Sequence, residues 1–481
     1  MTETNQTDSD EDSLTPQSHV SNLLRRYRLV EGLVHLQTDS SDETLANSFV
    51  QKQNLAELQQ YLNQLHPADI AHILEALPLA DRLLVWSMVT TENDGEVLLE
   101  TSDAVRETLI TDMHSHELVA AAEFLNTDEI ADLAPDLPQE VIDDVFRSLP
   151  MEEREQLRSA MSYPEDSVGA LMDFDVITIR EDVRLEVVLR YLRRFEELPD
   201  HTDQLFVVDR EERLQGVLLI SRLLVSDPET LVAEAMTKEI IKLCPDDVAQ
   251  QAANAFDRYD LVSASVVDET GKLLGRVTVD TVIDFIRDKA ESEALNLAGL
   301  SEEEDLFASV FQSVKNRWVW LAINLVTAFI ASRVIGIFED SIEKLVALAA
   351  LMPIIAGIGG NSGNQTITMI VRAMALDQIH MRSAWKLLAK EVGVSVINGI
   401  LWGTVVGVFT FAIYQDPELG LVMMLAMLLN LVLAALLGVL IPLTLRKFGR
   451  DPALGSSVMI TAVTDSGGFF IFLSLATFFL L

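Results

Sequence analysis

One carboxylate, Asp465, lies inside a long apolar stretch at the C-terminal end of the sequence. The residues around it read TAVTDSGGFF, so hydroxyl groups are its polar companions there. An ionisable group within a bilayer is costly, and such residues usually serve an ion or proton path. We therefore expect Asp465 to hold a cation. The alternative is a structural ion pair, for which Arg333 is the candidate partner.

A second polar element, PIIAGIGGNSGNQT at residues 353–366, also interrupts an apolar stretch. One proline and four glycines weaken a helix, and amide side chains are costly against lipid. We expect this stretch to line a pore, with Asn361 and Asn364 facing water or the ion path. The alternative is that its small residues only let helices pack closely.

The ligands in these two elements favour a hard cation. They offer carboxylate, amide, hydroxyl and carbonyl oxygens but neither Cys nor His, which argues against Zn²⁺ and Cu⁺ as substrates. Mg²⁺ gives up its water reluctantly, so a sparse oxygen-lined site would hold it through its hydration shell. A symmetric dimer would bring two copies of Asp465 to one axis and match the charge of a divalent ion.

Five apolar stretches must position these groups, each long enough for the ~20 residues that cross a bilayer. Lys and Arg gather before the first stretch and in the second and fourth loops, whereas the first and third loops are acidic. The positive-inside rule then places the N-terminal half in the cytoplasm and the C-terminus outside the inner (plasma) membrane. The stretches lie at 318–338, 345–376, 392–414, 419–445 and 454–481.

The residues before the first span carry the acidic excess of a chain whose formal net charge is −39. Such a surface repels nucleic acid and attracts cations, although it can also serve only for solubility. Residues 1–45 are predicted to be disordered because acidic and polar runs dominate them, with a short amphipathic helix as an option at 21–36. Residues 46–160 show apolar pairs at helical spacing between polar helix starts such as Thr127-Asp128-Glu129, which predicts a stack of short helices. Cys244 is the only cysteine, which excludes an intrachain disulfide.

Two similar segments follow, LFVVDREERLQGVLLISRLL at 205–224 and SASVVDETGKLLGRVTVDTVI at 263–283. In both, Val-Val-Asp ends a predicted strand, a polar turn follows, and a glycine stands seven residues after the Asp, at Gly216 and Gly275. Such a repeat indicates a tandem domain. The pattern resembles the paired nucleotide-sensing modules called CBS domains.

Beyond residue 45 the chain resembles the MgtE family of magnesium channels. The resemblance rests on PIIAGIGGNSGNQT, AKEVGVSVINGI, DPALGSS and TAVTDSGGFF, in this order after a CBS pair. It implies a multidomain homodimer whose pore is lined by the second and fifth spans. The implied parts are an all-α N-terminal helical domain (46–160), an α/β tandem CBS pair (161–290), a connecting plug helix (291–316) and an α-helical membrane domain with five transmembrane helices (317–481).

The same resemblance assigns roles to individual residues. It implies that Asp465 is the principal site for the hydrated ion, that Asn364 and Thr461 contact the ion path, and that Glu391 lies near its cytoplasmic mouth. It also implies that cytoplasmic Mg²⁺ closes the channel by binding acidic residues between the soluble domains and the plug. The candidates for that role are Asp257, Asp260, Asp284 and Glu293.

At two places the sequence departs from that family. Thr281 ends the run VTVDT, where a second Asp is expected, and Arg287 and Lys289 stand where an acidic run normally leads into the plug. We therefore expect weaker closure by cytoplasmic Mg²⁺. The missing Asp is the residue expected to hold a nucleotide ribose in many CBS modules, so the sequence argues against ATP binding.

We expect a non-enzymatic magnesium channel that passes Mg²⁺ inward without another energy source. No Walker-type phosphate loop is present, so an ATP-driven pump has no support. The alternatives are a proton-coupled divalent cation carrier that uses Asp465 as its proton site, and a membrane-anchored cation sensor without flux. The expected partners are a second copy of the chain, membrane lipid and Mg²⁺, with Mn²⁺ or Co²⁺ as further ions.

Overall fold

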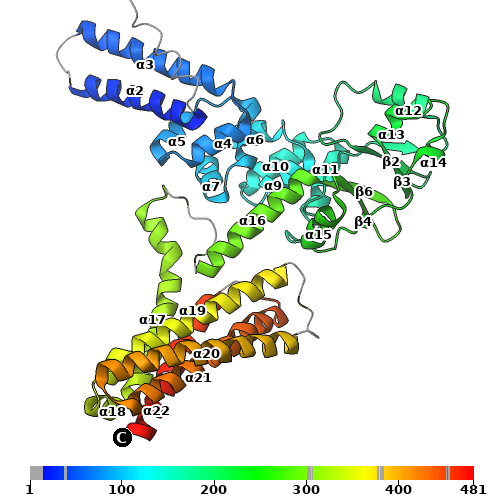
Figure 1. The fold of residues 1–481 in the computed structure, drawn as a ribbon. Helices are drawn as coiled ribbons and strands as arrows, with labels where there is room; N and C mark the ends of the chain where they lie inside the picture. The colour runs from blue at the N-terminus through cyan, green and yellow to red at the C-terminus, as the bar shows by residue number, and fades with distance from the viewer. Residues whose placement is uncertain are drawn as a thin grey trace, which may run out of the picture. The chain divides into compact units, whose positions relative to one another are not determined.

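The computed structural model describes two compact units, Met1–Arg287 with Asp305–Ala308, and Asp288–Glu304 with Ser309–Leu481 (Figure 1). The division agrees with the composition, since the acidic part of the sequence falls in the first unit and the long apolar helices fall in the second. The residues described are 15–36, 41–298, 300, 305, 307–375, 379, 384–450, 452 and 455–481.

The first unit begins with the predicted stack of short helices. Acidic residues near the helix starts help to fix them: the carboxylates of Glu117 and Glu129 accept the backbone N–H groups of His114 and Asn126, each at 2.7 Å. The helices are α2 (Pro16–Leu36), α3 (Ser41–Leu62), α4 (Pro67–Glu75), α5 (Leu79–Trp86), α6 (Thr91–Glu100), α7 (Asp103–Asp112), α8 (Ser115–Ala122), α9 (Thr127–Leu133), α10 (Gln139–Ser148) and α11 (Met151–Ala160).

The N-terminal segment corrects the prediction of disorder over residues 1–45. Helix α2 already starts at Pro16, and Val20, Leu23 and Leu24 are buried in one core with Leu58 and Leu62 of α3. Their spacing of three and four residues places these apolar side chains on one helix face. The helical domain therefore begins before residue 46, while residues 1–14 and 37–40 lie outside the described part.

The predicted tandem repeat is confirmed by two three-stranded sheets with the same topology. In each, the first strand pairs in parallel with the second and the second pairs antiparallel with the third, with a register shift at Val207/Val208 and again at Val266/Val267. The strands are β1 (Thr178–Arg180), β2 (Gln204–Val208), β3 (Leu214–Leu219), β4 (Lys242–Leu243), β5 (Ser263–Val267) and β6 (Leu273–Thr278). The helices of this pair are α12 (Leu185–Leu192), α13 (Ile220–Val225), α14 (Val232–Ala235) and α15 (Ala249–Tyr259).

The segment between the CBS pair and the membrane helices differs from the expected single plug helix at 291–316. Helix α16 (Val279–Ala298) starts directly after β6 and runs through the expected boundary at residue 290. The next helix, α17, begins at Val310. Two helices therefore share this segment.

The second unit consists of α17 (Val310–Ile337), α18 (Glu339–Lys344), α19 (Ala347–Ala375), α20 (Ala384–Tyr414), α21 (Pro417–Lys447) and α22 (Ser456–Leu480). Helices α17, α20, α21 and α22 contain stretches that are long and apolar enough to cross a membrane. Helix α19 has 29 residues but is not among them, because its glycine and amide residues lower its hydropathy. It is a continuous helix despite Pro353 and the four glycines that were expected to weaken it.

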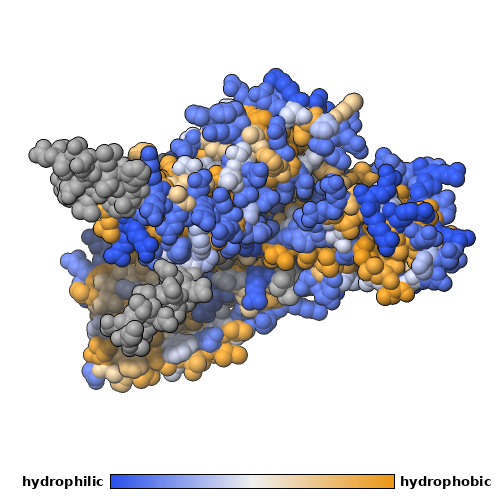
Figure 2. Space-filling model, turned by 90° about the horizontal axis from the view of Figure 1, so that it is seen from above, coloured by the Kyte–Doolittle hydropathy of each residue, from blue (hydrophilic) through white to orange (hydrophobic). Residues whose placement is uncertain are grey.

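Helix α19 packs between α21 and α22 through its apolar residues. Leu348, Leu351 and Ile355 lie in one buried cluster with residues of both partners, among them Met423 and Phe472. Helices α17 and α20 instead expose many large apolar side chains; Trp318 and Phe409, for example, are 58% and 65% exposed. In the face that Figure 2 shows, most of the surface is hydrophilic and hydrophobic residues gather in separate areas.

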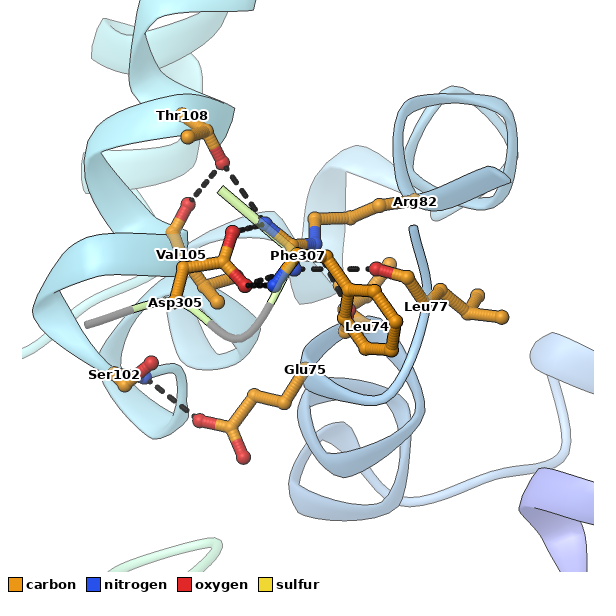
Figure 3. A network of polar contacts seen from close by, with 9 residues as sticks. All are labelled: Leu74, Glu75, Leu77, Arg82, Ser102, Val105, Thr108, Asp305 and Phe307. Carbon is orange, nitrogen blue, oxygen red and sulfur yellow. Dashed lines mark hydrogen bonds and ion pairs between the residues drawn. The ribbon is translucent and has the colours of Figure 1, made fainter. Parts of the chain in front are cut away.

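A buried ion pair joins the helical domain to the residues just before α17 (Figure 3). Arg82 of α5 is 0% exposed, and its Nη1 and Nη2 donate to Oδ2 and Oδ1 of Asp305 at 2.7 and 3.0 Å. Its Nε and Nη2 also donate to the carbonyl oxygens of Leu74 and Leu77 at 2.9 and 3.2 Å. The N–H of Phe307 donates to Oδ1 of Asp305 at 2.9 Å. All of these residues belong to the first unit.

Candidate functional site

Helix α22 positions Asp465 and Thr461 within a membrane-spanning helix. The side chain of Asp465 is half-buried, whereas Thr461 is exposed and its Oγ1 donates to the carbonyl oxygen of Ser457 at 2.8 Å. In the described part of the chain, no Lys, Arg or His forms an ion pair with Asp465, and Arg333 is exposed. The structure therefore gives no support to a structural ion pair.

Helix α19 shows that close packing and polar exposure occur together. Gly359, Gly360 and Gly363 are buried, and a Cβ at Gly363 would lie 2.4 Å from Cγ1 of Ile460. The glycines therefore bring α19 close to α22, as the packing alternative proposed. Asn361 nevertheless faces outward and is exposed, and Asn364 is half-buried with an Oδ1 that has no hydrogen-bond partner in the described part of the chain.

The glycine contacts also show where the polar residues of the two helices lie. A Cβ at Gly360 would lie 3.8 Å from Oγ1 of Thr464, and a Cβ at Gly363 would lie against Ile460, so the two helices run antiparallel here. Each of the four predicted membrane candidates directly follows one of these contact residues: Asn361 and Asn364 on α19, and Thr461 and Asp465 on α22. All four candidates therefore lie beside the contact between α19 and α22.

A test of this arrangement is the reactivity of engineered cysteines, made after the exposed Cys244 is replaced by serine. We expect Asn361→Cys to react readily with small water-soluble thiol reagents, because this position is exposed and its amide would be unfavourable toward lipid. Asn364→Cys should react more slowly because its position is half-buried. Ile370→Cys on the same helix is the control, since Ile370 is 1% exposed. Complete protection at position 361, with and without Mg²⁺, would contradict a water-filled path.

Glu391, the fifth candidate of the membrane unit, lies near the start of α20. It is 5% exposed, and its Oε1 is buried without a hydrogen-bond partner in the described part of the chain. Nζ of the neighbouring Lys390 lies 3.5 Å from that oxygen. Glu391 and Ser395 occupy one buried face of α20. The structure thus presents a buried carboxylate at this end of the bundle but does not bring it to Asp465.

The four regulatory candidates lie in two pairs. Asp257 and Asp260 are exposed at the end of α15, where Asp260 caps the helix in the left-handed conformation with a φ of 50°. Asp284 and Glu293 lie on α16, and Oδ1 of Asp284 is 3.6 Å from Nη2 of Arg287. Among the described residues, no three His, Cys, Asp or Glu side chains come close enough to enclose a metal ion.

Four further carboxyl groups of the first unit were missed by the sequence patterns. Burial, and next the charge of Asp173, raises the pKa of Asp128 to about 8. Burial likewise raises the pKa of Asp132 to about 7; the charge of Arg106 lowers this pKa, and repulsion from Glu129 and Asp284 raises it. The pKa values of Glu129 and Asp173 are also raised, chiefly by burial. One predicted candidate, Asp284, thus lies within electrostatic reach of a carboxyl cluster on α9.

Acidic residues in the first turn of a helix are ordinary, because they stabilise the N-terminal end of its dipole. From the sequence, Asp128 and Glu129 were therefore predicted only to mark the start of a helix. A cluster became visible once the fold placed Asp173, from the start of the CBS pair, near α9. Arg276 binds Asp173 there, with Nε 2.7 Å from Oδ2.

The CBS pair contains a cleft of about 510 Å³ whose lining includes Gln204, Thr237, Tyr259 and Ser263. Thr281 does not line it, and its Oγ1 lies 3.0 Å from Oγ1 of Thr278. The expectation that Thr281 disfavours ATP binding remains a prediction.

Comparison with known proteins places the chain in a family. Residues 352–475 match the family described as a divalent cation transporter, residues 65–166 match the MgtE intracellular N domain, and residues 168–227 and 232–288 match the CBS domain. The magnesium transporter MgtE of Thermus thermophilus is 31% identical over 447 residues, which cover 90% of this chain and 98% of that protein. The chain belongs to the MgtE family.

Other relatives agree with this assignment. The magnesium transporter MgtE of Bacillus subtilis is 24% identical over 89% of this chain and 94% of its own length. A crystal structure described as the cytosolic domain of the Mg²⁺ channel MgtE in complex with ATP is 29% identical, covers 50% of this chain and 97% of that chain, and has a TM-score of 0.45. The expected MgtE membership and the expected fold class are confirmed, apart from the count of five transmembrane helices, and the MgtE relatives are named as transporters.

Proposed function

We propose that this MgtE chain forms a homodimeric channel that passes Mg²⁺ into the cell down its electrochemical gradient. The observation that carries the proposal is the half-buried Asp465 of α22, which lies beside the contact between α22 and α19 and has no cationic partner in the described part of the chain. A carboxylate without a counter-ion inside a membrane domain is suited to bind a passing cation.

The membrane potential supplies the driving force for this flux. An inside-negative potential favours entry of a divalent ion by about 4.6 kcal/mol per 100 mV, twice the ~2.3 kcal/mol for one charge. The oxygen ligands that α19 and α22 offer favour Mg²⁺ with its hydration shell, and Mn²⁺ or Co²⁺ as competing ions. Two copies of Asp465 at a dimer axis would balance the charge of one such ion.

The proposed topology uses α19 as a fifth span beside the four apolar helices. Its 29 residues correspond to roughly 44 Å of helix, which exceeds the ~30 Å hydrocarbon core. Its packing between α21 and α22 buries Thr366, whereas Asn361 and Gln365 stay exposed and would face water or the second copy. Five crossings place the N-terminal domains in the cytoplasm and the C-terminus outside the inner membrane. The exposed apolar side chains of α17 and α20 would then contact lipid or the second copy.

Ion flux in proteoliposomes tests the function and separates it from the two alternatives. A channel should carry Mg²⁺ along an imposed voltage whether or not a proton gradient is present. Uptake that requires a proton gradient would identify a carrier with Asp465 as its proton site. If folded and correctly inserted protein carries no flux, the result supports the cation sensor.

We further propose that cytoplasmic Mg²⁺ regulates the channel through the acidic residues of the first unit. Ionised carboxylates that repel each other can be drawn together by a divalent cation, which then favours the closed arrangement in proportion to its tighter binding there. The pKa values of Asp128 and Asp132 are raised chiefly by burial, and neighbouring carboxylates add to the shift. A proton would compete with Mg²⁺ for these groups near neutral pH.

The weak-gating expectation gives a specific prediction. The channel with the double variant Thr281→Asp and Lys289→Glu should close at an Mg²⁺ concentration about fivefold lower than the parent channel, because added ligands increase the coupling between ion binding and closure. Open probability in inside-out patches across an Mg²⁺ titration measures it. The control variant, Thr111→Asp with Lys52→Glu, makes the same change in charge at two exposed positions elsewhere. An unchanged Mg²⁺ dependence in the first variant would exclude these two positions from setting the sensitivity.

A further inference from the structure

Asn430 is a fully buried amide on α21 that the sequence patterns did not single out. It is 0% exposed, and the buried residues around it on α21, such as Met427, Leu431 and Ala434, are apolar. Its Nδ2 donates to the carbonyl oxygen of Ile355 on α19 at 2.9 Å. That oxygen can only accept a hydrogen bond, so the nitrogen of the amide must face it.

Glycines on two other helices make room for this amide. A Cβ at Gly359 of α19 would lie 2.2 Å from Nδ2 of Asn430, and a Cβ at Gly468 of α22 would lie 2.8 Å from the same atom. Both separations are shorter than real Cβ contacts allow. Asn430 therefore occupies a slot between α19 and α22 that exists because both positions lack a side chain.

The slot adjoins the polar residues of the candidate ion path. Gly359 is followed by Gly360, which faces Thr464, and then by Asn361. Gly468 lies one helical turn beyond Thr464 and Asp465 on α22. By holding the carbonyl oxygen of Ile355, Asn430 constrains the height and rotation of α19 directly beside these residues.

Packing alone does not account for the amide. The Oδ1 atom of Asn430 is buried and has no hydrogen-bond partner in the described part of the chain, which is unfavourable for stability. A leucine has nearly the same branched shape and would fill the slot without an unpaired oxygen. The benefit of the amide must then come from the hydrogen bond to α19.

We propose that Asn430 is a positioning residue of the ion path: its amide sets the spacing and rotation of α19 against α22, and thereby the place of Asn361 relative to Asp465. This inference rests on the proposed function, because it requires that α19 and α22 line the path. Small displacements of groups that contact a bound species have large effects on rate, so the position of α19 matters more for flux than for stability.

The first test is Asn430→Leu, which keeps the shape of the side chain and removes the hydrogen-bond donor. We expect the thermal unfolding midpoint to stay unchanged or rise, and Mg²⁺ uptake into proteoliposomes to fall roughly tenfold. The reactivity of Asn361→Cys toward thiol reagents should change in the same background. Uptake at the parental rate per folded protein would overturn the proposal, since a purely structural residue gives that result.

The second test uses the glycine that faces the amide and does not depend on the leucine variant. Gly359→Ala should reduce uptake at least tenfold, because its Cβ collides with Nδ2. Adding Asn430→Ala removes the colliding atom, so the double variant should recover to the level of Asn430→Ala alone. Gly336→Ala on α17 is the control, since it lies outside the proposed path and nothing lies within 4 Å of its Cβ position.

The outcomes separate this inference from the proposed function. If the parent protein carries no Mg²⁺, the proposed function fails and the variants are not needed to show it. If the parent carries Mg²⁺ and Gly359→Ala is equally defective with Asn430 and with Ala at position 430, the two residues are not coupled and the positioning role is wrong.

Discussion

Replacing Asp465 by alanine should abolish Mg²⁺ uptake while the protein still folds and forms its dimer. The ion would lose its charged ligand beside the contact between α19 and α22, and a loss of roughly 3 kcal/mol of ion stabilisation would correspond to about a 100-fold lower uptake. Asp465→Asn should fail as well, because it keeps the shape and removes the charge. Uptake in a strain without other Mg²⁺ transporters, followed by flux in proteoliposomes, measures the effect.

Two control variants make the Asp465 result specific. Asp340→Asn removes an exposed carboxylate outside the long helices of the membrane unit and should leave uptake nearly unchanged. Arg333→Gln tests the ion-pair alternative, since a structural partner of Asp465 would reproduce the defect of Asp465→Asn. Normal uptake by both Asp465 variants would remove this residue from the mechanism.

The membrane candidates could be found from sequence because polar residues inside apolar stretches are a local signal. Asp465 and the two asparagines of α19 stand out against their immediate neighbours. Asn430 also lies in an apolar run, but a single asparagine there has no periodic or motif context. Its place depends on Gly359 and Gly468, which come from other helices. A contact between distant segments is set by packing, and composition does not reveal it.

Charged residues of the first unit show the same limit of prediction from sequence. The acidic runs near the N-terminus predicted disorder, but the apolar face of α2 was sufficient to bind it to α3. The carboxyl groups of Asp128 and Glu129 looked like ordinary acidic residues of a helix start, because their raised pKa values come chiefly from burial in the folded first unit. Charged residues can be counted from the sequence, but the burial that shifts their pKa values depends on the three-dimensional fold.

Breaking the buried ion pair between Arg82 and Asp305 should have the largest effect on the stability of the first unit. Arg82 is fully buried and the side chain of Asp305 is 6% exposed. Removing one partner of such a pair leaves an uncompensated buried charge, which costs about 3–5 kcal/mol. Asp305→Ala should therefore lower the local free energy of opening of α4 and α5 by roughly 3 kcal/mol. Hydrogen exchange of the full chain in detergent measures this opening.

The pH dependence of the pair follows from the carboxyl group. Burial by itself would raise the pKa of Asp305, but hydrogen bonds from Arg82 and from the Phe307 N–H, together with the charge of Arg82, hold it below its ordinary value. A lowered folded pKa contributes stability that is present above the ordinary aspartate pKa and lost as pH falls through the folded value. The difference in exchange between the parent and Asp305→Ala should thus be full at neutral pH and shrink in acid.

A control and a double variant show whether the burial of the pair is the cause. Asp103 forms an ion pair with Arg106 at 3.3 Å, but its side chain is 79% exposed, so Asp103→Ala should change stability by less than about 1 kcal/mol. Adding Arg82→Met to Asp305→Ala removes the stranded charge and should restore part of the lost protection, because residues in contact are not additive. If Asp305→Ala exchanges like the parent, or if the double variant loses the sum of both single effects, Asp305 does not neutralise Arg82 in the folded protein.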